Sequence, residues 1–100
     1  MSVEVRYARL AAEDMRAIRR WITREADRET ADRYLERVRV RCRRLADVPL
    51  GGTPRDELSA GVRSIGFERR LIIFYRVEDA SVLILRIVHG ARELEPLLGG

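Results

Sequence analysis

The chain has 100 residues, of which 46% are apolar and 36% are charged, so we expect a single globular domain spanning residues 1–100 rather than a disordered tail. Twenty basic residues outnumber sixteen acidic ones, which gives a net charge of +4, and all twenty are arginine. Because the sequence contains no lysine, mechanisms that need a lysine amine are excluded, among them Schiff-base formation and phosphate binding by a Walker-type loop.

The cysteine, histidine and apolar patterns exclude further classes. Cys42 is the only cysteine and His89 the only histidine, so a disulfide within the chain is impossible, and we expect neither a zinc site nor any other cofactor. The longest apolar run, Leu71–Tyr75, is far shorter than the ~20 residues of a membrane-spanning helix. The first residues have neither the basic start nor the apolar stretch of a signal peptide, so the sequence predicts a cytoplasmic protein.

The first half of the chain predicts a strand and two helices. Apolar residues alternate with charged ones over residues 3–7, which predicts a short strand with one buried face. Between residues 9 and 25 apolar residues recur every three or four positions, which predicts an amphipathic helix. Asp27 is the predicted N-cap of a second helix, which runs to about Asp47. The predicted buried stripes are Leu10, Ala11, Met15, Ile18, Trp21 and Ile22 on the first helix, and Ala31, Tyr34, Leu35, Val38, Cys42 and Leu45 on the second.

The second half predicts a sheet. Residues 50–61 contain glycines and a proline and are expected to form a loop. Strands are expected at 62–67, 70–77 and 82–89, joined by turns short enough for hairpins, and residues 90–95 are expected to add a last helical turn. The fold class that follows is α+β: an N-terminal strand, an antiparallel helix hairpin, then a three-stranded antiparallel meander, with the hairpin packed on a four-stranded, mainly antiparallel sheet.

Both faces of this sheet are predicted to be apolar. One helix hairpin covers only one face, so we expect a partner chain to cover the other, the alternative being cover by the loop and the C-terminus. Strict alternation assigns the side chains of the last two strands to two faces. In the first of these strands one side carries Leu71, Ile73, Tyr75 and Val77, and the other carries Ile72, Phe74 and Arg76. In the second strand one side carries Val82, Ile84 and Val88, and the other carries Leu83, Leu85 and Ile87.

Several stretches, taken in order, carry a family resemblance: Gly61–Arg63, Leu71–Val77 and Ile84–Glu93, preceded by Leu45–Pro49 and Gly52–Pro54. With the order of elements, they make the chain resemble the RelE/ParE toxin superfamily, and its ParE branch in particular. The resemblance extends over essentially the whole chain. It departs from the family pattern before the first helix, where Ala8 stands in place of a frequent serine or threonine N-cap.

The resemblance implies the toxin half of a bacterial type II toxin–antitoxin pair. ParE-like toxins are associated with poisoning of DNA gyrase without a catalytic site, and their ParD-like antitoxins lay a mostly helical segment across the toxin. We therefore expect a DNA gyrase inhibitor without catalytic residues, in a hetero-oligomer with a ParD-like antitoxin. We expect no membrane association and no direct sequence-specific binding of nucleic acid. A toxin-like binding module without toxicity is a further alternative.

The RelE branch of the same superfamily supplies the main alternative, a ribosome-dependent mRNA endonuclease. Such cleavage needs a base for the 2′-hydroxyl, an acid for the leaving oxygen and cations on the phosphate. Arg63, Tyr75, Arg86 and His89 are the residues of this chain that would fill these roles. The plainer interpretation is that His89 only caps the end of its strand.

Arginines within the predicted strands are the leading candidates for partner binding. Arg63 and Arg86 stand where apolar residues are expected, and a buried guanidinium is costly unless it is paired. We therefore expect each of them to meet a carboxylate or an anionic group of a partner, the alternative being that they point outward from a sheet edge. The meander places the strand of Arg76 between theirs, which allows all three to form one basic patch. The predicted partner-binding residues are Arg63, Arg76, Arg86, His89 and Arg92.

The arginines of the helices have a simpler interpretation. Arg16, Arg20 and Arg24 fall opposite the buried stripe of the first helix, and acids are interspersed along both helices, so we expect solvated faces. The alternative is that they steer an acidic antitoxin towards the toxin. Trp21 and Cys42 lie on the predicted buried stripes and are expected in the core.

Overall fold

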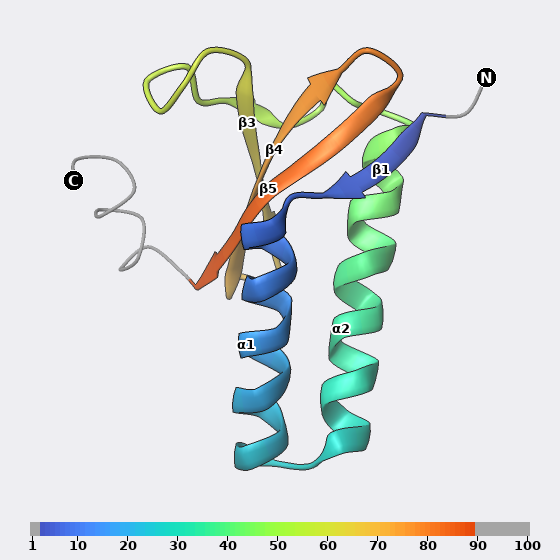
Figure 1. The fold of residues 1–100 in the computed structure, drawn as a ribbon, viewed down its shortest axis with the longest axis vertical. Coiled ribbons are helices and arrows are strands. Elements are labelled where there is room, and N and C mark those ends of the chain that lie inside the picture. Colours follow the sequence, from blue (N-terminus) through green and yellow to red (C-terminus); the bar gives the residue numbers. More distant parts are fainter. Residues whose placement is uncertain (1–2, 90–100) are drawn as a thin grey trace.

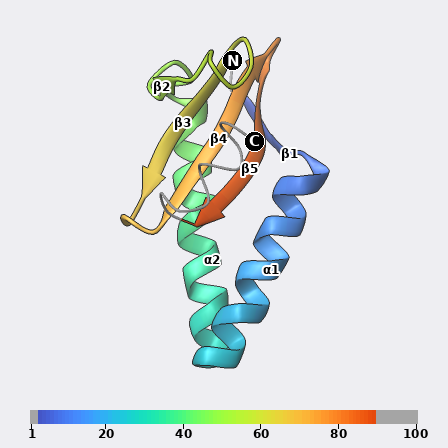
Figure 2. The same ribbon diagram turned by 90° about the vertical axis from the view of Figure 1, so that its left-hand side faces the viewer.

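The computed structural model describes residues 3–89, in which a helix hairpin packs against one face of a twisted sheet (Figure 1). The hairpin is longer than the sheet is tall, and its closed end projects well beyond the sheet in both views (Figures 1 and 2). In chain order the elements are β1 (Glu4–Tyr7), α1 (Arg9–Glu25), α2 (Arg28–Arg43), the single 3-10 turn η1 (Arg44–Ala46), β2 (Thr53–Pro54), β3 (Val62–Phe67), β4 (Leu71–Glu78) and β5 (Ser81–His89).

Within the described residues the sheet has five strands in the order β1-β5-β4-β3-β2. β1 runs parallel to β5 and the other neighbours are antiparallel, so the predicted N-terminal strand and three-stranded meander are confirmed. The prediction of four strands was wrong, because Thr53 and Pro54 pair with Ser64 and Arg63 at the edge of the sheet. An edge strand accommodates Pro54, whose missing N–H costs no hydrogen bond on the open side.

Both helices lie where the periodicity predicts them, and their starts differ. The side chain of Asp27 caps α2 by accepting a 2.7 Å hydrogen bond from the backbone N–H of Thr30, as predicted. Ala8 makes no side-chain cap for α1. Its backbone N–H instead donates to the carbonyl of Ile84 at 2.9 Å, which ties the start of α1 directly to β5. Within residues 3–89, neither helix has the length and the apolar composition needed to cross a membrane.

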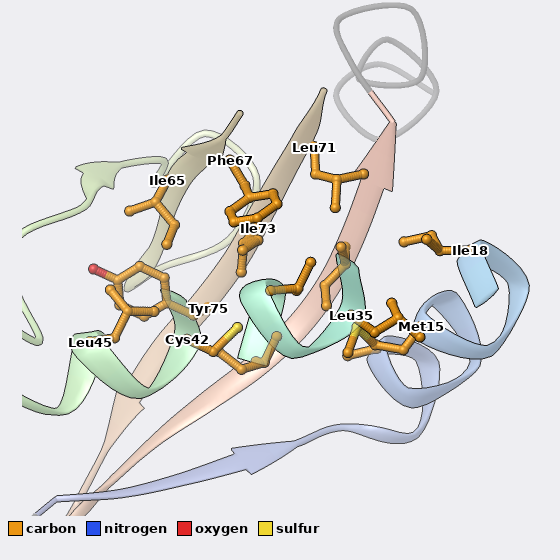
Figure 3. Packing of buried hydrophobic residues seen from close by; sticks show 14 of the residues in the cluster. Met15, Ile18, Leu35, Cys42, Leu45, Ile65, Phe67, Leu71, Ile73 and Tyr75 are labelled. Atoms are coloured by element: carbon orange, nitrogen blue, oxygen red, sulfur yellow. The ribbon is translucent and has the colours of Figure 1, made fainter. Parts of the chain in front are cut away.

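The main core lies between the helix hairpin and the sheet (Figure 3). Cys42 is fully buried in it, as predicted, whereas Leu10 and Trp21 are 46% and 42% exposed, so their assignment to the core was wrong. At about 100° per residue, both lie on the same flank of α1, to one side of the line through Ile18 and Ile22. The buried residues of the two helices are Ala11, Met15, Ile18 and Ile22 on α1, and Ala31, Leu35, Val38 and Cys42 on α2.

A β-bulge changes which residues of β5 face the helices. Tyr75 pairs with Ile84 and Phe74 with Arg86, so Leu85 is an extra residue in β5. An extra residue reverses the alternation beyond it. Ile87 therefore joins the core under the helices and Val88 the outer face, the opposite of the prediction from strict alternation.

The outer face of the sheet carries a small apolar cluster that the segment between β2 and β3 partly covers. Val62, Phe74 and Val88 form a second cluster there and are each at most 5% exposed. Leu58, from the segment between β2 and β3, packs against this cluster, and the guanidinium of Arg55 lies 5.6 Å from the centre of the Phe74 ring. Ile72 and Leu85 on the same face stay partly exposed, so the loop, one part of the alternative expectation, covers this face only in part. The helical turn expected at residues 90–95 lies outside the described residues.

Candidate functional site

A groove of about 240 Å³ lies between α1 and the C-terminal end of β5. It brings together two of the predicted site residues, Arg86 and His89, with two that the sequence did not single out for a functional role, Asp14 and Trp21. The bulge in β5 places Arg86 at this edge of the sheet, beside α1. The remaining lining residues are Ala17, Ile18, Ile87 and Val88.

Asp14 holds α1 to the edge of β5. β1 pairs with β5 only as far as Ile84, so among residues 3–89 no strand pairs with the following residues of β5 on that side. Asp14 takes the place of one: its Oδ2 accepts a 2.9 Å hydrogen bond from the backbone N–H of Ile87. The same carboxylate accepts two more from Arg86, from Nε at 2.8 Å and from Nη2 at 3.0 Å. A bidentate pair of this kind fixes the orientation of the guanidinium and also balances its charge.

An aromatic pair forms the other end of the groove. The rings of Trp21 and His89 meet edge to face, with centroids 5.6 Å apart and planes at 78°. Trp21 keeps 42% of its surface exposed, so the groove presents a large apolar ring next to charged groups. The position of Trp21 on the flank of the helical stripe was the signal in the sequence that could have separated it from the core residues.

Arg63 and Tyr75 lie at a different place, where they bind the loop after η1. The Tyr75 hydroxyl donates to the carbonyl of Pro49 and accepts from the backbone N–H of Gly52, both at 2.8 Å. Arg63 Nη1 donates to the carbonyls of Leu50 and Gly52 at 2.9 and 2.8 Å. Tyr75 has no exposed surface. These two side chains therefore fasten the loop to the helix side of the sheet.

Arg76 lies on the opposite face of the sheet from Arg63. In the β3–β4 register Val62, an outer-face residue, pairs with Arg76, while Arg63 pairs with Tyr75. Arg76 forms an ion pair with Glu78 at 3.5 Å, and its buried Nε makes no hydrogen bond within the described residues. The expected single patch of Arg63, Arg76 and Arg86 is therefore wrong, and Arg92 lies outside the described residues.

Cys42, the buried thiol of the core, has the properties of a structural residue rather than a nucleophile. Burial raises the pKa of the Cys42 thiol, and a hydrogen bond with the Tyr7 hydroxyl opposes this only in part. A protonated, buried thiol is a poor nucleophile. Among residues 3–89, no three histidine, cysteine, aspartate or glutamate side chains converge as a set of metal ligands.

Comparisons with known proteins place the chain in a family. The family model described as the ParE toxin of the type II toxin–antitoxin system parDE matches residues 5–94. A chain from the chromosomal ParDE toxin–antitoxin system of Pseudomonas aeruginosa is 25% identical with a TM-score of 0.78, and the match covers 90% of this chain and 98% of that one. A chain from the RelBE2 toxin–antitoxin complex of Mycobacterium tuberculosis is also 25% identical, with a TM-score of 0.68 and coverage of 89% and 99%. No curated protein sequence matches the chain. Since the family model spans nearly the whole sequence, the chain belongs to the ParE family of toxins of type II toxin–antitoxin systems.

Proposed function

We propose that this ParE-family toxin inhibits DNA gyrase by binding it, and that the groove between α1 and β5 is the surface that makes the contact. The observation that carries the proposal is the exposed ring of Trp21, held edge to face by His89 and flanked by the Arg86–Asp14 pair. Tryptophan and arginine beside a concave surface are the residue types that most often dominate the binding energy of a protein interface.

The groove is built to present a fixed surface. Asp14 makes three hydrogen bonds to two consecutive residues of β5, and its side chain is only 16% exposed. Trp21 and His89 are held by each other and by the elements that carry them. A surface ordered in advance loses little conformational entropy on binding, so more of the contact energy is retained as affinity.

The arrangement of the nuclease candidates supports binding over catalysis. An endonuclease needs a base, an acid and phosphate-binding cations around one reacting phosphate. Of the four candidates, Arg86 and His89 line the groove, whereas Arg63 and Tyr75 hold the loop at Pro49–Gly52. Tyr75 has both its hydrogen bonds satisfied by backbone groups and no surface exposed to a substrate. RelE-like mRNA cleavage is therefore the weaker candidate.

A ParD-like antitoxin is the proposed natural partner. The solved structures similar to this chain come from a ParDE system and from a toxin–antitoxin complex, RelBE2, which supports a hetero-oligomer for this toxin too. Exposed apolar residues other than Trp21 are available for such a contact, with Val48 and Leu50 61% and 67% exposed after η1. Both proposed partners place the action of the toxin in the cytoplasm.

The test is inhibition of purified gyrase by the purified chain. We expect the toxin to inhibit supercoiling or to increase gyrase-linked DNA cleavage, and Trp21→Ala to lose at least ~10-fold in potency, as expected for an interface hot spot. Val40→Ala is the matched control, because Val40 is an apolar helix residue that is 38% exposed and lies outside the groove.

No effect of excess wild-type toxin on gyrase would refute the proposed target. Equal loss of potency in Trp21→Ala and Val40→Ala would refute the groove as the contact surface while leaving the target in place. A ribosome-dependent translation reaction with labelled mRNA tests the nuclease alternative. Cleavage there that is abolished by His89→Ala would favour the RelE-like activity.

A further inference from the structure

A concentrated positive surface lies on the solvent side of α1. Five arginines and Thr23 line a shallow depression of about 430 Å³ there. We call this surface the arginine face; it comprises Arg16, Arg19, Arg20, Thr23 and Arg24 of α1 and Arg28 at the start of α2. It lies on the far side of α1 from the buried residues Ile18 and Ile22.

Most of the charge on this face is not neutralised by acids. Arg19 pairs with Asp32 at 2.9 Å, but within residues 3–89 Arg16, Arg20, Arg24 and Arg28 form no ion pair. The acid nearest to this row in the helical repeat, Glu13, is paired with Arg9 at 3.8 Å. The arginines of α2 differ, because four of them have carboxylate partners. These pairs are Arg33–Glu29, Arg37–Glu68, Arg39–Glu36 and Arg43–Glu36.

The geometry of the face is regular and accessible. Arg16, Arg20 and Arg24 recur every four residues along α1, so they form a row in which neighbours are about 6 Å apart along the helix axis. The lower part of α1 belongs to the end of the hairpin that projects beyond the sheet (Figures 1 and 2). A long, rigid ligand can therefore lie against the row without meeting the sheet.

We propose that the arginine face binds the phosphate backbone of duplex DNA without reading its sequence. A protein partner would need apolar or aromatic anchors, and none of the described residues that line the face is apolar. Backbone binding needs only cations placed along the phosphates. A single-stranded ligand is disfavoured because the face has no aromatic side chain on which bases could stack. This site is separate from the groove and does not rest on gyrase being the target.

The test is binding of the 100-residue chain to a short DNA duplex of arbitrary sequence, followed by fluorescence anisotropy at several salt concentrations. With four or five phosphates neutralised, log K should fall against log salt with a slope of about −4. The variant Arg16→Gln/Arg20→Gln/Arg24→Gln should flatten the slope by about 3 and weaken binding at least ~10-fold near 0.1 M salt. All three side chains are exposed, and glutamine is about as good a helix former as arginine, so the fold is retained.

A charge-matched control separates a defined site from general positive charge. Arg6→Gln/Arg44→Gln/Arg69→Gln removes the same number of charges from exposed positions outside the arginine face. The DNA affinity of this control should stay within about 3-fold of the wild-type value, since salt screens exposed charges that do not contact the DNA. An equal loss of affinity in both triple variants overturns the proposal.

Two further measurements distinguish the other outcomes. Trp21→Ala changes the groove and not the arginine face, so it should bind DNA as tightly as the wild type does. A failure of the gyrase proposal is thereby distinguished from a failure of the DNA proposal. If the face instead takes an acidic protein segment, the triple variant will lose affinity for the antitoxin while its DNA affinity is unchanged, and the proposal is then wrong.

Discussion

Asp14 of α1 and Arg86 of β5 are joined by two hydrogen bonds although they lie 72 residues apart in the sequence. The same carboxylate accepts a hydrogen bond from the backbone N–H of Ile87. One side chain therefore pairs with a partly buried cation and also satisfies a backbone donor at the edge of β5. The floor of the candidate groove depends on this contact, because it fixes α1 against the end of β5.

Removing the carboxylate of Asp14 should destabilise the fold. In Asp14→Ala the guanidinium of Arg86 and the N–H of Ile87 lose the hydrogen bonds that this carboxylate accepts, and we expect the free energy of unfolding to fall by about 2 kcal/mol. Urea denaturation followed by circular dichroism measures the change. Asp32→Ala is the control, since Asp32 pairs with Arg19 at the surface and such exposed pairs contribute roughly 0–1 kcal/mol. Equal losses in the two variants would contradict the role given to Asp14.

The hydroxyl of Tyr75 should matter for stability. Tyr75→Phe keeps the buried ring but leaves the carbonyl of Pro49 and the N–H of Gly52 without a partner, which should cost about 1–3 kcal/mol in thermal or urea unfolding. Tyr34→Phe is the control, because within residues 3–89 the Tyr34 hydroxyl makes no hydrogen bond while its ring packs on Phe67. A folded Tyr75→Phe protein with unchanged stability but no toxicity would point to a catalytic hydroxyl instead.

Gly52 should not tolerate a side chain. A Cβ at this position would lie 2.5 Å from the Tyr75 hydroxyl oxygen and 3.0 Å from the carbonyl oxygen of Ser64. Gly52→Ala should therefore displace the loop from Tyr75 and lower the midpoint of urea unfolding. Gly66→Ala is the matched control, since a Cβ there meets no atom within 4 Å. A Gly52→Ala protein as stable as Gly66→Ala would show that the loop is not held as described.

The cap of α2 should make stability depend on acidic pH. The backbone N–H of Thr30 donates to Asp27 and lowers the pKa of its carboxyl below the ordinary value of 3.8. A group with a lowered folded-state pKa stabilises the protein above its unfolded-state pKa, and this contribution is lost as the pH falls through the folded-state value. Asp27→Asn keeps an acceptor oxygen but does not titrate. Its melting temperature should therefore fall less steeply than that of the wild type as the pH drops below about 4. If the melting temperatures of the wild type and Asp27→Asn fell equally with pH, the role of Asp27 as a titrating cap would be disproved.

The thiol of Cys42 should react only when the fold opens. Burial raises its pKa and removes it from solvent, so labelling by a disulfide reagent at mildly alkaline pH should be slow and should accelerate with denaturant. Val48→Cys in a Cys42→Ala background provides an exposed reference thiol, since Val48 is 61% exposed. Labelling of Cys42 as fast as that of the reference thiol would contradict its place in the core.

The sequence by itself determined the elements and most of their buried faces. Helical periodicity placed α1, and the Asp27 cap marked where α2 begins, because both are local properties of consecutive residues. The resemblance to ParE toxins, carried by stretches spread along the chain, agrees with the family match over residues 5–94. Of the residues that the sequence predicts for the site, Arg86 and His89 line one groove.

Only the tertiary structure decided which side chains meet. The extra residue Leu85 reverses the alternation of β5. The bulge depends on how β5 pairs with β4, so the sequence of β5 alone does not predict it. The ring of Trp21 meets that of His89 at the edge of β5, and Asp14 reaches Arg86 beyond the last residue pair of β1 and β5. The Asp14–Arg86 pair spans 72 residues and depends on how the edge of α1 packs against the edge of β5. The periodicity within each element carries no information about that packing.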